Sequence, residues 1–364
     1  MIGIHALQSV APSNLNRDDT GAPKDAVFGG VRRARISSQC LKRSARVWWR
    51  DTYGLNDELA VRTKRLAEPL AGQLVAKGVA SDDADLLAER VTVALGLKGN
   101  ARKKGETAVL VFASPGEIAA LADRAIEQRD ALLGKTPEAA KAMLVSALGS
   151  AASVDLALFG RMLAEIDGTN VDAACSVAHA ISTHEVRMEE DYFTAVDDLK
   201  SDEEDQGAGM LGEVLFQSAC FYRYSSIDEK QLLTNLARDT TLAARAVESY
   251  VQAVARAMPT GHQTTFAAHN PPSVVLVTRE PDAVSLANAF LEPVPTDASE
   301  RLDAQSARRM LSEWAELSRL LGGDRRGVIC GVDAALPDEI PAGTERVSSF
   351  DALAASARAM IQGA

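Results

Sequence analysis

Alternating apolar and polar residues predict several strands along this chain. In Ile2 to Val10, Ile2, Ile4 and Ala6 fall on one face, and His5 and Leu7 fall on the other. This period of two is typical of a β-strand. Similar alternation occurs at residues 153–162, 174–186, 217–226 and 264–278, and residues 328–332 have the composition of a buried strand. The pattern therefore predicts a sheet assembled from segments that are far apart in the sequence.

Helical periodicity dominates the region from about residue 56 to residue 149. Ser114-Pro115-Gly116-Glu117 forms a capping box with proline at the first helical position, which marks a helix start. Further helices are predicted at 228–258, 304–321 and 350–361. The order of elements predicts the α+β class, with helices on one side of the sheet and a helical insertion between sheet-forming regions.

A second excursion from the sheet is strongly acidic. Residues 189–205 hold nine acids and one lysine, and the glycine-rich segment 206–212 follows them. An acidic run must remain in contact with water, and glycines permit a sharp reversal of the chain. We therefore expect a protruding hairpin or loop here.

Positive charge is concentrated near the N-terminus of an acidic protein. The whole chain has 39 Lys and Arg against 50 Asp and Glu, a net charge of −11. Residues 1–50 nevertheless carry a net charge of +6, and residues 28–50 contain seven basic side chains and no acid. Such a segment is typical of polyanion binding, although a solvated basic face is the commoner origin of a charge run.

The local pattern favours a nucleic-acid backbone as the ligand. Gly29-Gly30 permit a tight loop, Val31 to Ile36 alternates as a basic ribbon, and Ser37-Ser38 can cap a helix. The spacing places the polar and basic residues of that helix on one face, namely Gln39, Lys42, Arg43, Arg46 and Arg50. Each part suits phosphate oxygens. Only 17 residues are aromatic, so recognition by base stacking is not expected.

Catalytic, metal and membrane motifs are weak. The four cysteines are widely spaced, which predicts reduced thiols and no zinc site. His184-Glu185-Val186-Arg187-Met188 lacks the second histidine of a zincin, and we interpret His179 and His184 as structural. No apolar run is long enough for a membrane span and no signal peptide begins the chain, so a cytoplasmic protein without cofactors is expected.

Several longer motifs resemble one protein family, the CasC backbone subunits of the type I-E CRISPR Cascade complex. They are NLNRDD at 14–19, KDAVFGGVRRARISSQCLKR at 24–43, SVAHAISTHEV at 176–186, DYFTAVDDL at 191–199 and FYRYSSID at 221–228. The resemblance runs from the first strand to about residue 290 and is poor in much of 56–150. The family's lysine cluster after Phe290, which is associated with target DNA, has no counterpart, since 291–300 contains no Lys or Arg.

The resemblance implies a hand-like subunit with three parts. A palm with a modified RNA-recognition-motif (ferredoxin-like) sheet would comprise residues 1–55, 150–186 and 214–364. Helical fingers would occupy 56–149, and a protruding thumb would occupy 187–213. The fingers and the thumb coincide with the helical insertion and the acidic excursion identified from the sequence pattern.

The resemblance also implies which residues contact RNA. The family's guide-contacting positions fall on Lys24, Arg32, Arg35, Ser37, Gln39, Lys42, Arg43 and Arg46. Lys42 and Arg46 would bind phosphates. Arg33 is added from its spacing alone. Met162 and Leu211 would be apolar wedges beside a base that the thumb displaces.

The implied function is non-catalytic. Copies of the chain would assemble as a helical filament on one CRISPR RNA (crRNA), together with other Cascade subunits, and present the guide in segments for pairing with target DNA in antiviral defence. Two alternatives remain open at this point. The chain could be a metal-dependent RNA-cleaving backbone subunit, or a stand-alone RNA-binding protein.

Overall fold

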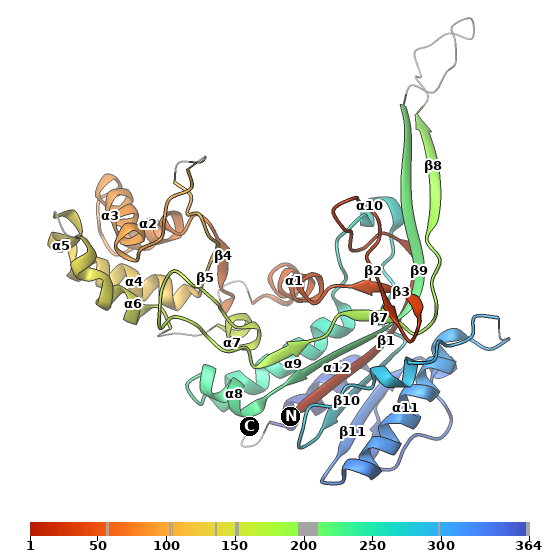
Figure 1. Ribbon diagram of the computed structural model, residues 1–364. Helices are drawn as coiled ribbons and strands as arrows, with labels where there is room; N and C mark the ends of the chain where they lie inside the picture. The colour runs from red at the N-terminus through yellow and green to blue at the C-terminus, as the bar shows by residue number, and fades with distance from the viewer. Residues whose placement is uncertain are drawn as a thin grey trace, which may run out of the picture. The chain divides into compact units, whose positions relative to one another are not determined.

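The computed structural model describes residues 1–55, 58–101, 103, 105–134, 137–149, 153–195, 210–297 and 299–361. The chain divides into two compact units (Figure 1). The first comprises Met1–Trp48, Val177–Ser226 and Glu248–Met360, and the second Trp49–Ser176, Ile227–Val247 and Ile361–Ala364. The α+β class is confirmed. The limits proposed for palm, fingers and thumb stay predictions.

The first unit is built on a large, mostly antiparallel sheet. Its main path has the order β12-β11-β10-β1-β9-β7-β3-β2, and β6 and β8 also pair with β9. Segments from both ends of the chain therefore lie side by side at its centre. The strands are β1 (Ile2–Ser13), β2 (Asp25–Phe28), β3 (Val31–Ile36), β6 (Cys175–Val177), β7 (Ala180–Ser182), β8 (Glu189–Ala195), β9 (Met210–Ile227), β10 (Val274–Arg279), β11 (Arg326–Gly331) and β12 (Thr344–Arg346).

Both faces of the central strands are buried, so the prediction of helices on one side is wrong. In β1 every residue from Ile2 to Leu7 is buried, and the five with side chains are at most 1% exposed. Because neighbouring strand residues point to opposite faces, both faces must be covered. Burial lowers the pKa of His5 in this strand to about 3, so the imidazole is neutral at physiological pH.

Different helices cover the two faces of this sheet. Met310 and Trp314 of α11 (Leu302–Leu321) pack with Leu276 and Ile329, and the short η4 helix (Ala287–Phe290) joins the same cluster. On the other face, Ile4 lines a small cavity with residues of α1 (Ser38–Trp48) and of the end of α9 (Thr240–Arg256). The remaining helices of this unit are α10 (Gln263–Phe266), η5 (Asp333–Ala335) and α12 (Phe350–Ala359).

Strands β8 and β9 continue beyond the sheet as a two-stranded ribbon (Figure 1). Its register pairs Glu189 with Phe216 and Ala195 with Met210. A Cβ on Gly212 would come within 2.7 Å of the Phe193 ring, so this ring lies directly over the glycine. The ribbon agrees with the protruding hairpin expected from the acidic run. The centre of that run, residues 196–209, is outside the described residues.

The second unit is mainly helical around its own apolar core. Its buried leucines include Leu70, Leu74, Leu87, Leu121 and Leu144, which come from helices spread over the predicted insertion. A two-stranded sheet of β4 (Val61–Thr63) and β5 (Val111–Ala113) accompanies them. The helices are η1 (Trp49–Tyr53), α2 (Ala67–Ala76), α3 (Ser81–Ala94), α4 (Pro115–Glu127), α5 (Arg129–Leu133), η3 (Pro137–Ala140), α6 (Lys141–Ala147), α7 (Val154–Phe159) and α8 (Glu229–Asn235).

Three elements differ from the sequence prediction. The first part of the strand predicted over 264–278 is the short helix α10, and only Val274–Arg279 forms a strand, β10. Residues 153–162 contain helix α7 and not a strand, because Ser153 Oγ accepts from the N–H of Leu156 and caps a helical turn. The single helix predicted over 228–258 is two helices, α8 and α9. Ala237 and Arg238 between them have φ values of +51° and +65°, which a right-handed α-helix cannot accommodate.

The four cysteines form no disulfide. Three are buried, and Cys40 is half-buried. Among the described helices, none combines the length and the apolarity that crossing a bilayer requires.

Candidate nucleic-acid interface

The basic segment forms a hairpin that leads directly into a capped helix. Gly29 and Gly30 turn the chain from β2 to β3 with φ values of +61° and +80°. At the end of β3, Ser37 Oγ accepts from the N–H of Cys40 at 3.3 Å and caps α1. The N–H of Ser37 itself donates to Asn16 Oδ1 at 2.8 Å. The predicted glycine loop, ribbon and capped helix are therefore confirmed.

The backbone of Lys24 fixes this hairpin to its surroundings. Its N–H donates to the carbonyl of Asn16 at 2.9 Å, and its own carbonyl accepts from the N–H of Arg35 at 2.9 Å and from Gln217 Nε2 at 3.3 Å. Strand β9, the loop before β2 and strand β3 thus meet at one residue. The half-buried Lys24 side chain belongs to this junction.

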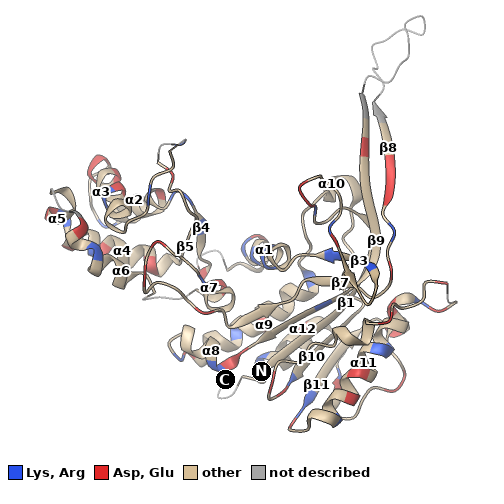
Figure 2. Ribbon diagram, viewed as in Figure 1, with Lys and Arg blue, Asp and Glu red and all other residues tan. Residues whose placement is uncertain are grey.

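Two arginines of β3 present charge at the surface of the hairpin. The Arg32 side chain is 59% exposed and forms an ion pair with Asp25. Arg35 Nε donates to the carbonyl of Asp25 at 2.9 Å, and Arg35 Nη1 lies 2.9 Å from His179 Nδ1. Figure 2 shows positive residues on β3 and α1, and acidic residues on the β8–β9 ribbon.

Helix α1 separates its apolar and basic faces as predicted, except that it ends at Trp48, so Arg50 lies in η1 and not on this helix. Leu41 and Ala45 are buried against the sheet. Gln39 and Arg43 are exposed, and Lys42 and Arg46 are half-buried. Arg43 Nη1 reaches Thr260 Oγ1 at 3.4 Å. The first unit thus places Lys24, Arg35 and Ser37 at the start of a helix that carries three further basic residues and Gln39.

Arg33 is a structural residue, and the expectation that it contacts RNA is wrong for this structure. It is fully buried. Its guanidinium donates to the carbonyls of Phe28, Ser182 and Phe290 at 3.1, 3.1 and 2.8 Å. A buried charge needs such partners, and all three are internal. Arg33 therefore joins the hairpin to β7 and to η4.

His179 is exposed at this surface, whereas the sequence pattern had favoured a structural role. Partial loss of contact with water, and then the charges of Arg35 and Lys24, lower the pKa of His179. A neutral ring can accept a hydrogen bond from Arg35. His184 is the structural histidine, since its buried Nε2 accepts from the N–H of Cys220 at 3.1 Å. A prediction of β6 and β7 as separate short strands would have shown that His179 lies between them.

Met162 lies in the second unit and is 88% exposed. The preceding residue, Arg161, is buried and forms an ion pair with Glu117 at 2.9 Å. Arg161 also donates to the carbonyls of Thr169 and Phe112 at 2.8 and 2.9 Å. The exposed Met162 side chain thus follows a residue whose own side chain is held by three internal contacts.

Leu211 belongs to β9 in the ribbon of the first unit, where it pairs with Thr194. The structure describes the backbone of Leu211 but not its side chain. The wedge role of Met162 and Leu211 therefore remains a prediction. In the part of the chain that the structure describes, no three His, Cys, Asp or Glu side chains gather in a way that could hold a metal ion.

Comparisons with known proteins show which family and which solved structures the chain resembles. A search of curated proteins finds no match. One solved structure, titled "CRISPR RNA-guided surveillance complex, pre-nicking", contains a chain with 31% identity and a TM-score of 0.86, covering 99% of both chains. A chain of another, titled "CRISPR RNA-guided surveillance complex", has 27% identity and a TM-score of 0.74, covering 98% of this chain and 99% of that one. The model of the CT1975-like protein family matches residues 2–355, and the chain therefore belongs to this family.

Proposed function

We propose that this protein is a non-catalytic, guide RNA-binding subunit of a type I-E Cascade surveillance complex. Several copies lie along one crRNA in the cytoplasm, together with other subunits, and present the guide for pairing with target DNA. The proposal is supported by chains of similar fold, over nearly their full length, in RNA-guided surveillance complexes.

The observation that carries the proposal is the group of basic residues on β3 and α1. It comprises a hairpin arginine, a capped helix N-terminus and a helix face with three cations. Phosphate contacts of this kind fix the position of a nucleic acid without reading its sequence. That property suits a subunit whose guide changes from one complex to the next, because base pairing then supplies the specificity.

Exposed Met162 suits the displacement of a base from the guide. An uncharged, flexible side chain can fill the gap that an unstacked base leaves. Leu211 would act from the β8–β9 ribbon. Regularly displaced bases would divide the guide into the segments that pair with DNA.

Replacing both Lys42 and Arg46 with alanine tests the proposed binding of the RNA phosphate backbone. Guide binding should weaken to a similar degree for every RNA sequence, because phosphates carry no sequence information. The slope of log K against log salt should fall by about 0.7 for each lost phosphate contact. Fluorescence anisotropy with guides of different sequence, over a range of salt concentrations, measures both quantities.

Arg50→Ala serves as a control just beyond the end of α1, in η1, where Arg50 pairs with its neighbour Asp51 at 2.7 Å. It should change the slope less than the double variant does. A loss of guide affinity that depended on base identity would contradict the proposed binding of phosphates. Metal-dependent cleavage of target RNA by the assembled protein would instead establish the nuclease alternative.

A further inference from the structure

Arg223 is a buried cation of the first unit, and both of its hydrogen-bond acceptors are neutral. It belongs to β9 and is only 7% exposed. Its Nη1 donates to Gln8 Oε1 at 2.7 Å and to the carbonyl of Val254 at 3.0 Å. Burial lowers the pKa of Arg223 to about 10, which still leaves the guanidinium charged at neutral pH. A full positive charge is therefore held inside the protein by two uncharged oxygen atoms.

Two other buried arginines have stronger partners. Arg161 pairs with Glu117, and these side chains are 2% and 0% exposed. The guanidinium of Arg33 donates to three carbonyls. For Arg223, no ion pair is found within the described residues. Because burying a charge is costly unless the charge is paired, Arg223 has the least compensated charge of the three.

Neighbouring groups do not supply the missing negative charge. The thiol of Cys40 and the phenol of Tyr250 lie near Arg223 and become anionic only at high pH. Burial raises the pKa of the Cys40 thiol, so it stays neutral at pH 7. Val254 lies in the last turn of α9, and its carbonyl contributes to the negative end of the helix dipole. That partial charge, about half an elementary charge, offsets only part of the guanidinium charge.

One edge of the guanidinium remains for a ligand. Within the described residues, both hydrogen bonds that Arg223 donates come from Nη1, and its buried Nε has no hydrogen-bond partner. Nε and Nη2 form an edge with which an arginine can bind an anion through two parallel N–H groups. A buried donor without an acceptor is destabilising. This edge therefore predicts an acceptor that comes from outside the chain.

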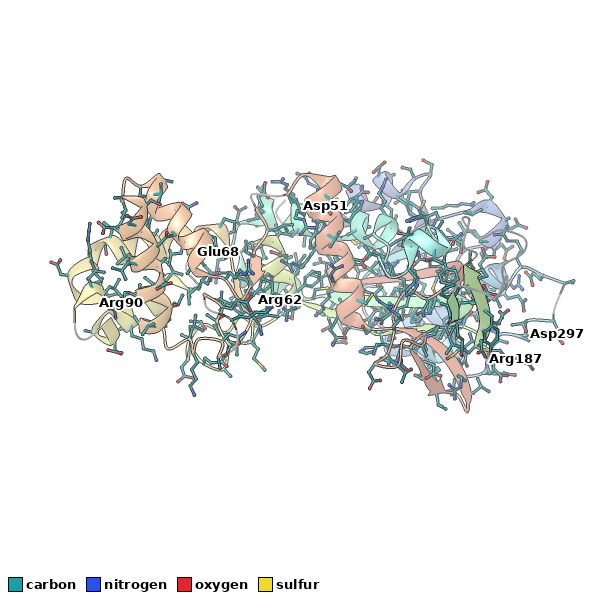
Figure 3. All side chains as sticks on the ribbon, turned by 90° about the horizontal axis from the view of Figure 1, so that it is seen from above. Asp51, Arg62, Glu68, Arg90, Arg187 and Asp297 are labelled. Atoms are coloured by element: carbon teal, nitrogen blue, oxygen red, sulfur yellow. The ribbon has the colours of Figure 1, made fainter. Side chains whose placement is uncertain are left out.

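A cavity beside Arg223 has room for one small particle. Its volume is about 20 Å³, and it lies between β1, β9, α1 and α9. The residues that line it include Ile4, Leu41, Ala45, Arg223, Ser225 and Ala253. Figure 3 shows α1, which ends shortly before the labelled Asp51, crossing over the strands of the first unit. A single water-sized particle needs about 10–15 Å³, so a carboxylate or phosphate ion with several heavy atoms is too large.

We propose that this cavity binds one halide ion, chloride under ordinary conditions, on the Nε–Nη2 edge of Arg223. A halide is monatomic, so it fits the volume, and it carries the negative charge that a water molecule lacks. Ser225 lies two residues along β9 on the same face as Arg223, and its hydroxyl can donate a further hydrogen bond. The bound ion reduces the repulsion between Arg223 and the cations on the opposite face of α1, and it thereby stabilises the position of this helix.

Thermal unfolding of the full-length protein without RNA tests the site. Sodium chloride replaces sodium gluconate at constant ionic strength, because gluconate is too large for the cavity and the screening of surface charges stays the same. Tm should rise by about 2 °C when chloride reaches about ten times its dissociation constant, since a ligand that binds only the folded state stabilises it. Sodium bromide should raise Tm in the same way.

Two variants remove the site in different ways. Arg223→Met removes the charge at similar side-chain length, and Ala253→Val fills part of the cavity. Each should abolish the chloride-dependent rise in Tm. Arg33→Met is the matched control, because it removes a buried arginine whose acceptors are all internal carbonyls. It should lower Tm in both salts and keep the rise. If circular dichroism shows that Arg223→Met does not fold, Ala253→Val carries the test.

Anomalous scattering from crystals that contain bromide locates the ion. The expected peak lies within hydrogen-bond distance of Arg223 Nε. Peaks on exposed basic residues alone would indicate an adventitious ion only and would overturn the proposal. An equal Tm in chloride and in gluconate would overturn it as well, because water would then satisfy Nε. So would a chloride-dependent rise that persists in a folded Arg223→Met variant. All these measurements are made without guide RNA, so they do not depend on the proposed function.

Discussion

Arg161 carries a buried charge and directly precedes Met162, the exposed residue proposed as a wedge. Its partner Glu117 is fully buried and also completes the capping box of α4 by accepting from the N–H of Ser114 at 2.8 Å. Arg161→Met should therefore destabilise the protein by about 3–5 kcal/mol, because it leaves Glu117 charged and without its cation. Urea unfolding followed by circular dichroism measures this difference.

A surface ion pair in the same helix provides the comparison. Arg124 and Glu127 lie 2.7 Å apart with side chains that are 44% and 48% exposed. Arg124→Met should cost only about 0–1 kcal/mol, since water screens that pair. Equal, small costs for the two variants would show that Arg161 does not anchor the Met162 segment.

Single residues were predictable where local spacing determines their surroundings. The basic face of α1 and the Ser37 cap follow from periodicity and capping preference, and both are present. Arg33 was not predictable in this way. Its burial depends on carbonyls of Ser182 and Phe290, which are far away in the sequence, and spacing carries no information about them.

The β2–β3 hairpin depends on two glycines that are not equivalent. At Gly29 a Cβ would lie 1.7 Å from the carbonyl oxygen of Leu291, whereas at Gly30 it would meet nothing within 4 Å. Gly30→Ala should cost about 1 kcal/mol for the left-handed backbone alone. Gly29→Ala should cost clearly more, because backbone must also move. Thermal unfolding of both variants tests this order, and equal costs would contradict the packing of Leu291 on the turn.

At the scale of elements, strong sequence signals predicted the secondary structure correctly, whereas short apolar runs did not. Strand β1, the capping box of α4 and strand β11 lie where the pattern placed them. The α7 segment, with the sequence VDLALF, is apolar apart from Asp155, so its periodicity could not distinguish a helix from a strand. The break between α8 and α9 has no glycine or proline to mark it, and the helical pattern continues across it.

At the scale of the whole molecule, charge is separated between surfaces. The first 50 residues carry +6, and the remaining 314 carry −17. Part of this excess lies on the β8–β9 ribbon, where Glu189, Glu190, Asp191 and Glu213 are exposed. Association with RNA should therefore be directed to the basic surface of β3 and α1, while acidic surfaces oppose binding elsewhere. The separation of positive and negative charge was visible in the sequence. Which strands and helices carry each charge could be determined only from the fold.

The central claim is that several copies of this chain assemble on one guide RNA. Native mass spectrometry of the purified protein, mixed with a CRISPR guide RNA and with the other subunits of its complex, tests it most directly. A fixed number of copies greater than one on each guide is the predicted result, and the Lys42→Ala/Arg46→Ala variant should reduce it. A single copy per guide, in the presence of all the partner subunits, would contradict the claim.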